Sequence, residues 1–141
     1  MKYLVDTCVI SELSRPKPND RVLKWLIGHQ LKDEFFVSSV SIGELRQGIA
    51  ELADTDVRKV RLLKWLDQQV LPAFKGRVLD YDQSAAVKWG DIMGETRRTG
   101  RVRPDLDAQI AAIAVVHDMT VLTRNESDMA FTGARTCNPF E

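Results

Sequence analysis

Apolar residues along this chain form two patterns, short runs and longer stretches with helical spacing. The short runs predict strands at residues 3–5, 35–37, 78–79 and 120–123, with a final short segment near 136–137. The longer stretches predict helices at residues 7–13, 20–27, 41–53, 56–71, 84–99 and 105–118. Because strands alternate with helices, the pattern predicts an α/β domain whose parallel sheet is covered on both faces.

Capping and breaking residues set the expected helix boundaries. Ser41 and Glu44 match a capping box at the start of the third helix, and Pro72 is expected just beyond the fourth. Pro104 disfavours a helical residue before it, so the last helix should begin at Asp105, its natural N-cap. That helix is apolar on nearly all sides and is therefore expected to be buried.

The composition is that of an ordinary globular protein. With 141 residues, the chain predicts a single domain spanning 1–141 with a sizeable core. The formal net charge is zero, so nucleic-acid binding would have to rest on a local patch. Cys8 and Cys137 suit a reducing compartment, and their spacing leaves a disulfide open. No signal peptide or membrane-spanning run is visible, so a cytoplasmic location is expected.

Four acidic residues lie where a strand gives way to a helix or where a helix begins: Asp6, Glu44, Asp107 and Asp128. Such junctions gather along one edge of the sheet, and ligands bind outside the carboxyl ends of parallel strands. Asp6 has no adjacent Lys or Arg. It could instead cap the next helix, although Thr7 can do so. For Glu44 the alternative role is the capping box.

Two pairs of residues compete for the other positions in the site. Asp105 and Asp107 both belong to the start of one helix. We assign the structural cap to Asp105 and the functional role to Asp107, whose ionised form the helix dipole favours. Asn125 and Asp128 share one turn, where Asp128 could also be a plain solvated residue. We favour Asp128 for the site, with Asn125 assisting.

A cluster of carboxylates without basic partners suggests a metal site. Two carboxylates about 5 Å apart repel by roughly 3 kcal/mol at an effective dielectric of about 20, so four together would be destabilising without a cation. Ligands that are all oxygen favour a hard ion, Mg²⁺ or Mn²⁺. Zinc is disfavoured because His29 and His117 lack helix-spaced partners, and His117 is expected to be a partly buried structural residue.

Arginines are concentrated just before Asp107, in a stretch without acids. Guanidinium groups suit phosphate, and single-stranded or looped RNA is bound through such backbone contacts. A solvated loop or a partner-binding surface is an equal alternative. The candidate substrate-binding residues are Arg97, Arg98, Arg101 and Arg103.

Five segments, in this order, resemble the motifs of PIN-domain ribonucleases, especially the VapC toxins of toxin–antitoxin pairs and their FitB-like relatives. The segments are YLVDTCVISEL at 3–13, SSVSIGELRQG at 38–48, DAQIAA at 107–112, TRNESD at 123–128 and NPF at 138–140. The chain departs from the family pattern in two ways. Met129 follows the fourth acid where an aromatic is common, and some relatives carry their last acid at the position of Asn125.

The resemblance implies a three-layer α/β/α PIN-like domain that hydrolyses RNA phosphodiester bonds with Mg²⁺, for which Mn²⁺ can substitute. It places Asp6 and Asp107 as direct metal ligands, with Thr7 and Thr123 as supporting hydroxyls. Glu44 would order or deprotonate the attacking water. It also implies a homodimer, inhibition by a cognate VapB-type antitoxin, and contact with DNA only through that antitoxin.

Other functional classes fit the sequence less well. A phosphoacceptor receiver domain needs a lysine late in the chain, whereas the last one here is Lys88. A Rossmann nucleotide-binding domain needs a glycine-rich loop after the first strand, and none follows it. The remaining alternative is a PIN-like binding module that has lost catalysis and acts through a DNA-binding partner. The four filled acidic positions argue against it.

Overall fold

Five parallel strands form the centre of the molecule. In the computed structural model, which describes residues 1–101 and 103–141, they are β1 (Lys2–Val5), β2 (Glu34–Ser38), β3 (Val78–Leu79), β4 (Thr120–Leu122) and β5 (Arg135–Cys137). Their order is β3-β2-β1-β4-β5, and every neighbouring pair is parallel. The carboxyl ends of all five strands therefore lie at one edge of the sheet, with β1 in the middle.

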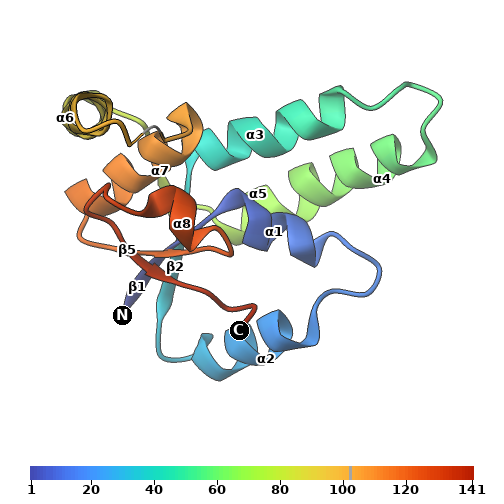
Figure 1. Ribbon diagram of the computed structural model, residues 1–141. Coiled ribbons are helices and arrows are strands. Elements are labelled where there is room, and N and C mark those ends of the chain that lie inside the picture. The colour runs from blue at the N-terminus through green and yellow to red at the C-terminus, as the bar shows by residue number, and fades with distance from the viewer. Residues whose placement is uncertain (102) are drawn as a thin grey trace.

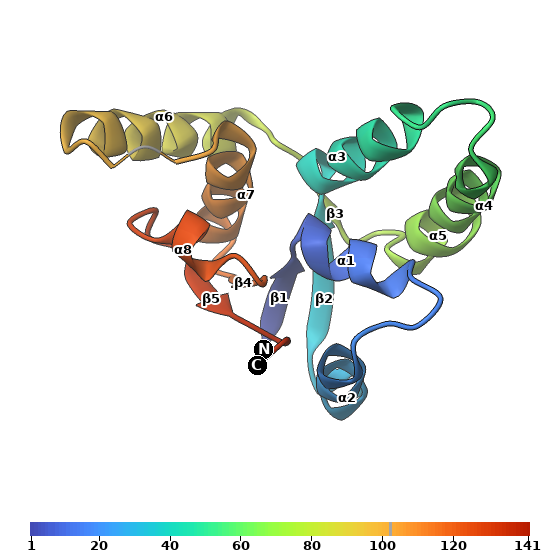
Figure 2. The ribbon, with the colours of Figure 1, turned by 45° about the vertical axis from the view of Figure 1, so that its right-hand side comes forward.

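Helices connect the strands and cover both faces of the sheet (Figure 1, Figure 2). Those before β3 are α1 (Thr7–Leu13), α2 (Asp20–His29), α3 (Ser39–Ala50), α4 (Val57–Trp65), the π-helical turn η1 (Leu66–Val70) and α5 (Leu71–Ala73). Those after β3 are α6 (Gln83–Arg98), α7 (Asp105–Val116) and α8 (Glu126–Met129). This arrangement confirms the predicted three-layer α/β/α fold.

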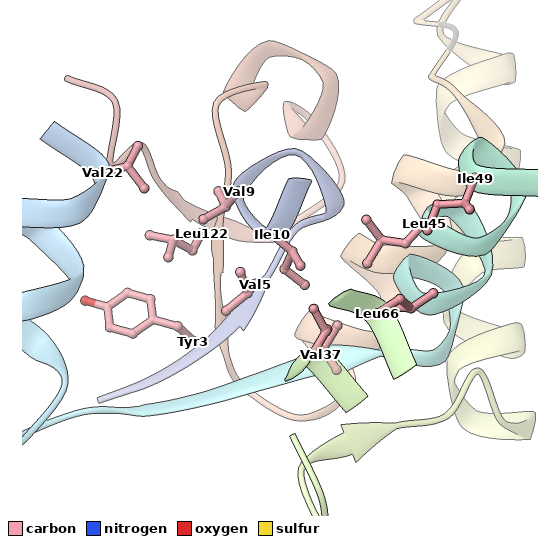
Figure 3. Close-up of a cluster of buried hydrophobic side chains, with 11 residues drawn as sticks. Tyr3, Val5, Val9, Ile10, Val22, Val37, Leu45, Ile49, Leu66 and Leu122 are labelled. Carbon is pink, nitrogen blue, oxygen red and sulfur yellow. The ribbon is translucent and has the colours of Figure 1, made fainter. Parts of the chain in front are cut away.

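Alternate residues of β1 pack into separate cores on the two faces of the sheet. Tyr3 and Val5 belong to the cluster drawn in Figure 3, together with side chains from α1, α2, α3 and η1. Leu4 belongs to a second cluster, with Val121 and residues of α7. Successive strand side chains point to opposite faces, so a strand buried on both sides is apolar at every position. The continuous apolar run at 3–5 follows from this.

Helix α7 is buried along most of its length, as its apolar sequence predicts. Its buried residues are Ala108, Ile110, Ala111, Ala112, Ile113 and Ala114. Despite this apolar character, no helix in the described part of the chain is both long and apolar enough to cross a bilayer. The burial of α7 fixes its first turn, which carries Asp107, at the carboxyl edge of the sheet.

The predicted start of the third helix is wrong. Helix α3 begins at Ser39, and its N-cap is Ser38, whose hydroxyl accepts the Ser41 N–H at 3.0 Å. The capping box of Ser41 and Glu44 therefore does not form. Because Ser38 serves as the cap, the Glu44 carboxylate is available for another contact.

The fourth predicted helix is interrupted by the π-helical turn. The Leu71 N–H bonds to the Leu66 carbonyl, one residue further back than in an α-helix. Pro72 lies in the first turn of α5 and not beyond the helix as predicted. Because proline has no N–H, its place here leaves one backbone bond missing in the helical turns that continue from η1 into α5.

Candidate active site

Asp6 joins the central strand to α1. It is 3% exposed, and its own N–H donates to the Leu122 carbonyl of β4 at 2.9 Å. One carboxylate oxygen accepts the Thr7 N–H at 2.8 Å and the other accepts the Thr123 hydroxyl at 2.7 Å. Asp6 is the N-cap of α1, so the expectation that Thr7 fills that role is wrong. Asp6 therefore caps α1 and also lies at the candidate site.

Glu44 reaches the same place from α3. Its Oε1 accepts the Thr7 hydroxyl at 2.8 Å, which ties the first turn of α1 to α3. Burial raises the pKa of Glu44, the Thr7 hydrogen bond opposes that rise, and the charge of Asp6 adds to it. Glu44 is thus a partly desolvated carboxylate beside a second one.

Asp107 lies in the first turn of α7 and is half-buried. Burial is the main cause that raises the pKa of Asp107 to about 6, and the charges of Asp6, Asp128 and Glu44 add to the rise. The other three predicted acids therefore all act on Asp107 by their charge.

The prediction that Asp105 is the N-cap of α7 is wrong, because Pro104 occupies that position. Pro104 has extended backbone angles of φ −58° and ψ 136°, and no side-chain cap bond is made there. Asp105 is the exposed first residue of the helix. With φ already fixed by its ring, proline suits this boundary without a capping side chain.

Asn125 and Asp128 take different positions around the site. The Asn125 N–H donates to the Thr123 hydroxyl at 3.0 Å, so the hydroxyl that holds Asp6 also fixes this loop. Asn125 lines a cavity together with Asp6, Glu44 and Asp107. Asp128 lies in α8, does not line that cavity, and affects Asp107 by its charge. The short helix α8 was predicted only as a turn.

These residues surround a cavity of about 220 Å³, which we call the acid cavity. Its wall consists of Asp6, Thr7, Cys8, Ser11, Glu44, Asp107 and Asn125, and none of these described residues is basic. Cys8 and Ser11 were not predicted as site residues. Helical spacing in α1 could have predicted Ser11. Residues three and four apart share one face of a helix, and Ser11 lies four residues after Thr7.

The acid cavity has the chemistry of a site for a hard cation. Burial, with the charge of Asp6 next, raises the pKa of the Cys8 thiol, so sulfur is present as a neutral, poor metal ligand and the oxygens dominate. Within the described residues, no three His, Cys, Asp or Glu side chains lie close enough together to hold a metal ion by protein ligands alone. Mg²⁺ is compatible with this arrangement because it takes one or two carboxylates and keeps several waters.

Neither histidine contributes to the acid cavity. His29 stacks on Trp25 with ring centroids 3.8 Å apart, and its Nδ1 lies 2.6 Å from the Trp25 carbonyl. His117 is the exposed C-cap of α7, so the prediction that it is partly buried is wrong. Neither His29 nor His117 was among the predicted metal ligands.

The predicted arginine stretch does not line the acid cavity. Arg97 and Arg98 are in the last turn of α6, which extends away from α1 and α3 in Figure 2, and Arg98 pairs with Glu95 at 2.5 Å. The Arg101 guanidinium lies 4.1 Å from the centre of the Phe131 ring. Arg103 donates to the Ala130 carbonyl at 2.7 Å. The Arg103 guanidinium lies 5.3 Å from the centre of the Phe131 ring, so Arg101 and Arg103 share this ring. The role of the four arginines in substrate binding stays a prediction.

Comparison with known proteins identifies the family. The family described as PIN domain matches residues 3–131. The chain belongs to the PIN domain family. This PIN domain is 36% identical to VapC ribonuclease Y4jK of Sinorhizobium fredii over 138 residues, covering 98% of this chain and 97% of that protein. It is also 36% identical to Toxin FitB of Neisseria gonorrhoeae over 137 residues, covering 97% of each.

A solved structure agrees with these sequence comparisons. The structure of FitAB bound to a DNA fragment contains a chain that superposes on this PIN domain with a TM-score of 0.88 at 35% identity. The match covers 100% of this chain and 96% of that one. The family and the fold predicted from the five motifs are confirmed, whereas the roles of single residues stay predictions.

Proposed function

We propose that this PIN domain is a ribonuclease that requires Mg²⁺ or Mn²⁺ and acts as the toxin of a toxin–antitoxin pair. The observation that carries the proposal is the convergence of Asp6, Glu44 and Asp107 on one cavity whose described wall holds no Lys or Arg. Structural carboxylates are normally paired when they are buried. The names of the relatives, a VapC ribonuclease and the toxin FitB, support the same activity.

Asp6 and Asp107 are the residues that would hold the cation. When bound, the cation lowers the pKa of a coordinated water and polarises the scissile phosphate. Asp6 is held in place for this by the Thr7 N–H and the Thr123 hydroxyl. Asp107, with a pKa of about 6, is ionised at neutral pH. Glu44, oriented through Oε1 by Thr7, has its second oxygen available to take a proton from the attacking water.

An antitoxin partner fits a groove beside the acid cavity. This cavity of about 270 Å³, which we call the α3–α4 groove, shares Thr7, Ser11 and Glu44 with the acid cavity. Its other lining residues include the apolar Leu45, Ile49, Leu52, Leu62 and Trp65. A peptide segment lying along these side chains would also cover the acidic residues. We place a VapB-type antitoxin here, and DNA would be reached only through it.

The FitAB structure bound to DNA supports a toxin of this kind acting within a complex. We extend the proposal to a homodimer in the cytoplasm. Size-exclusion chromatography with light scattering, on the chain with and without its antitoxin, measures whether the protein is a homodimer.

RNA cleavage with and without chelation tests the activity. We expect the purified protein to cleave RNA with Mg²⁺ or Mn²⁺, to stop when EDTA is added, and to resume when the metal is restored. Cleavage that survives exhaustive chelation would contradict the metal requirement. A folded, antitoxin-binding protein that cleaves no RNA with either ion would instead support the inactive binding module.

A further inference from the structure

We infer that Arg124 binds a phosphate of the RNA at the edge of the acid cavity, an inference that rests on the proposed ribonuclease function. The three carboxylates of the acid cavity outweigh the charge of one divalent cation, so the site still repels the RNA backbone, and a positively charged side chain close to the reacting phosphate would favour binding. The wall of the cavity supplies none. Arg124 carries a guanidinium at this position without being part of the wall.

The backbone of Arg124 is fixed against residues of the acid cavity. Arg124 follows Thr123, which is fully buried and donates to Asp6, and it precedes Asn125, which lines the cavity. The residues on both sides of Arg124 are therefore held at the acid cavity, so the Arg124 side chain starts at the cavity edge.

The guanidinium of Arg124 is held in place but keeps its donors available. It lies 3.8 Å from the centre of the Phe140 ring, and its Nη2 is 3.9 Å from Oε1 of Glu12. A separation of 3.9 Å is an ion pair without a hydrogen bond, and no hydrogen bond from this side chain to another described residue is seen. The side chain is 52% exposed.

This arrangement is suited to phosphate. A guanidinium presents N–H groups in a planar fork that matches two phosphate oxygens. Stacking on Phe140 restricts the side chain beforehand, so less rotamer freedom is lost when the phosphate binds. The buried Glu12, which also lies 3.7 Å from Arg15, fixes the fork by charge. By contrast, Arg98 is occupied by Glu95, and Arg101 stacks on Phe131 away from the cavity wall.

Steady-state cleavage of a fluorescein-labelled single-stranded oligoribonucleotide of mixed sequence, measured over a series of salt concentrations, tests the inference. We expect Arg124→Gln to raise KM about tenfold or more, as for loss of a charged hydrogen bond. The slope of log KM against log salt should fall by about 0.7, the value for one phosphate contact on a single strand. Arg124→Lys should keep the slope and raise KM less, because lysine keeps the charge and loses the fork.

Two controls separate this role from general effects. Arg135→Gln removes an arginine of similar exposure, 59%, that pairs with Asp118 at the opposite edge of the sheet, and it should leave KM unchanged. Phe140→Ala removes the stacking platform and should raise KM less than Arg124→Gln does.

Each outcome decides the inference. A wild-type KM and salt slope for Arg124→Gln would overturn it, and so would an equal effect of Phe140→Ala, which would make Arg124 only an anchor for the C-terminal segment. Should thermal melts show Arg124→Gln unfolded, Arg124→Lys decides alone: wild-type KM overturns the inference, and a raised KM with an unchanged slope supports it. Failure of the wild type to cleave the oligoribonucleotide would refute the ribonuclease proposal itself.

Discussion

At the scale of single residues, Asp6 both caps α1 and faces the acid cavity. Its position after a buried strand was enough to predict that it lies at the sheet edge. The hydroxyl that holds it belongs to Thr123, which is 117 residues away, and no local pattern predicts that contact. Because Asp6 accepts hydrogen bonds from Thr7 and Thr123, replacing it would disturb structure as well as chemistry. Asp107 gives the cleaner test of the site.

Asp107→Asn should stabilise the metal-free protein at neutral pH. The pKa of Asp107 is raised from 3.8 to about 6, so the folded state holds its proton more tightly than the unfolded state does. As pH rises from about 4 to about 6, wild type loses stability that the asparagine variant keeps. Discounted for partial exposure, the gain at pH 7.5 should be about 1–2 kcal/mol, or roughly 3–6 °C in Tm.

Thermal melts of the chelated proteins at pH 4 and pH 7.5 measure this effect. The two proteins should melt together at pH 4, where Asp107 is protonated in the folded state. A variant less stable than wild type at pH 7.5 would show that Asp107 is a hydrogen-bonded structural acid.

Thr123→Val should abolish RNA cleavage and lower stability by about 1–3 kcal/mol, because the Asp6 carboxylate and the Asn125 N–H both lose a partner. Thr132→Val is a matched control. Thr132 is also buried, accepts the N–H two residues on, at Ala134, and donates to a carbonyl away from the acid cavity. It should lose similar stability and keep activity. Equal activity of the two variants at a temperature where both are folded would contradict a role for Thr123 in the site.

At the scale of elements, the alternation of strands and helices predicted a parallel sheet covered by helices on both faces. The predicted element boundaries were wrong where backbone hydrogen bonding departs from the regular pattern of an α-helix. The π-helical turn η1 depends on one shifted backbone bond, from Leu71 to Leu66, which apolar spacing does not reveal. Helix α8 has four residues and is too short for a periodic signal. The start of α3 was missed because Ser38, at the end of its strand, also serves as the cap.

Helix α4 offers a test of the antitoxin groove. Leu62→Lys places a charge in the apolar part of the α3–α4 groove, so it should abolish antitoxin binding while RNA cleavage continues. Val60→Lys is the control, because Val60 is 61% exposed on the same helix and does not line the groove. Calorimetric titration of each variant with the antitoxin measures the affinity. Binding of Leu62→Lys as tight as that of wild type would place the antitoxin elsewhere.

At the scale of the whole molecule, the zero net charge and the acid cavity together mean that the field of the protein does not attract RNA. Binding must come from local groups, because a bound divalent cation offsets only part of the charge of the three carboxylates in the cavity. The sequence predicted that the four acids gather at one edge of the sheet, because each lies at a junction between elements or at the start of a helix, and three of them line the acid cavity. It did not identify Arg124 as an RNA-binding candidate, because that role depends on Phe140 and Glu12 coming together from distant parts of the chain. Contacts of this kind require the folded structure.

Metal-dependent RNA cleavage by Asp107→Asn and Asp105→Asn, assayed side by side with wild type, tests the central claim most directly. Both aspartates lie in the first turn of α7, but Asp107 lines the acid cavity and Asp105 does not. We expect Asp105→Asn to cleave RNA with Mg²⁺ or Mn²⁺ at the wild-type rate. Asp107→Asn should lose at least about a hundredfold in kcat/KM, or roughly 3 kcal/mol of transition-state stabilisation. Cleavage by Asp107→Asn at the rate of the other two proteins would contradict the account.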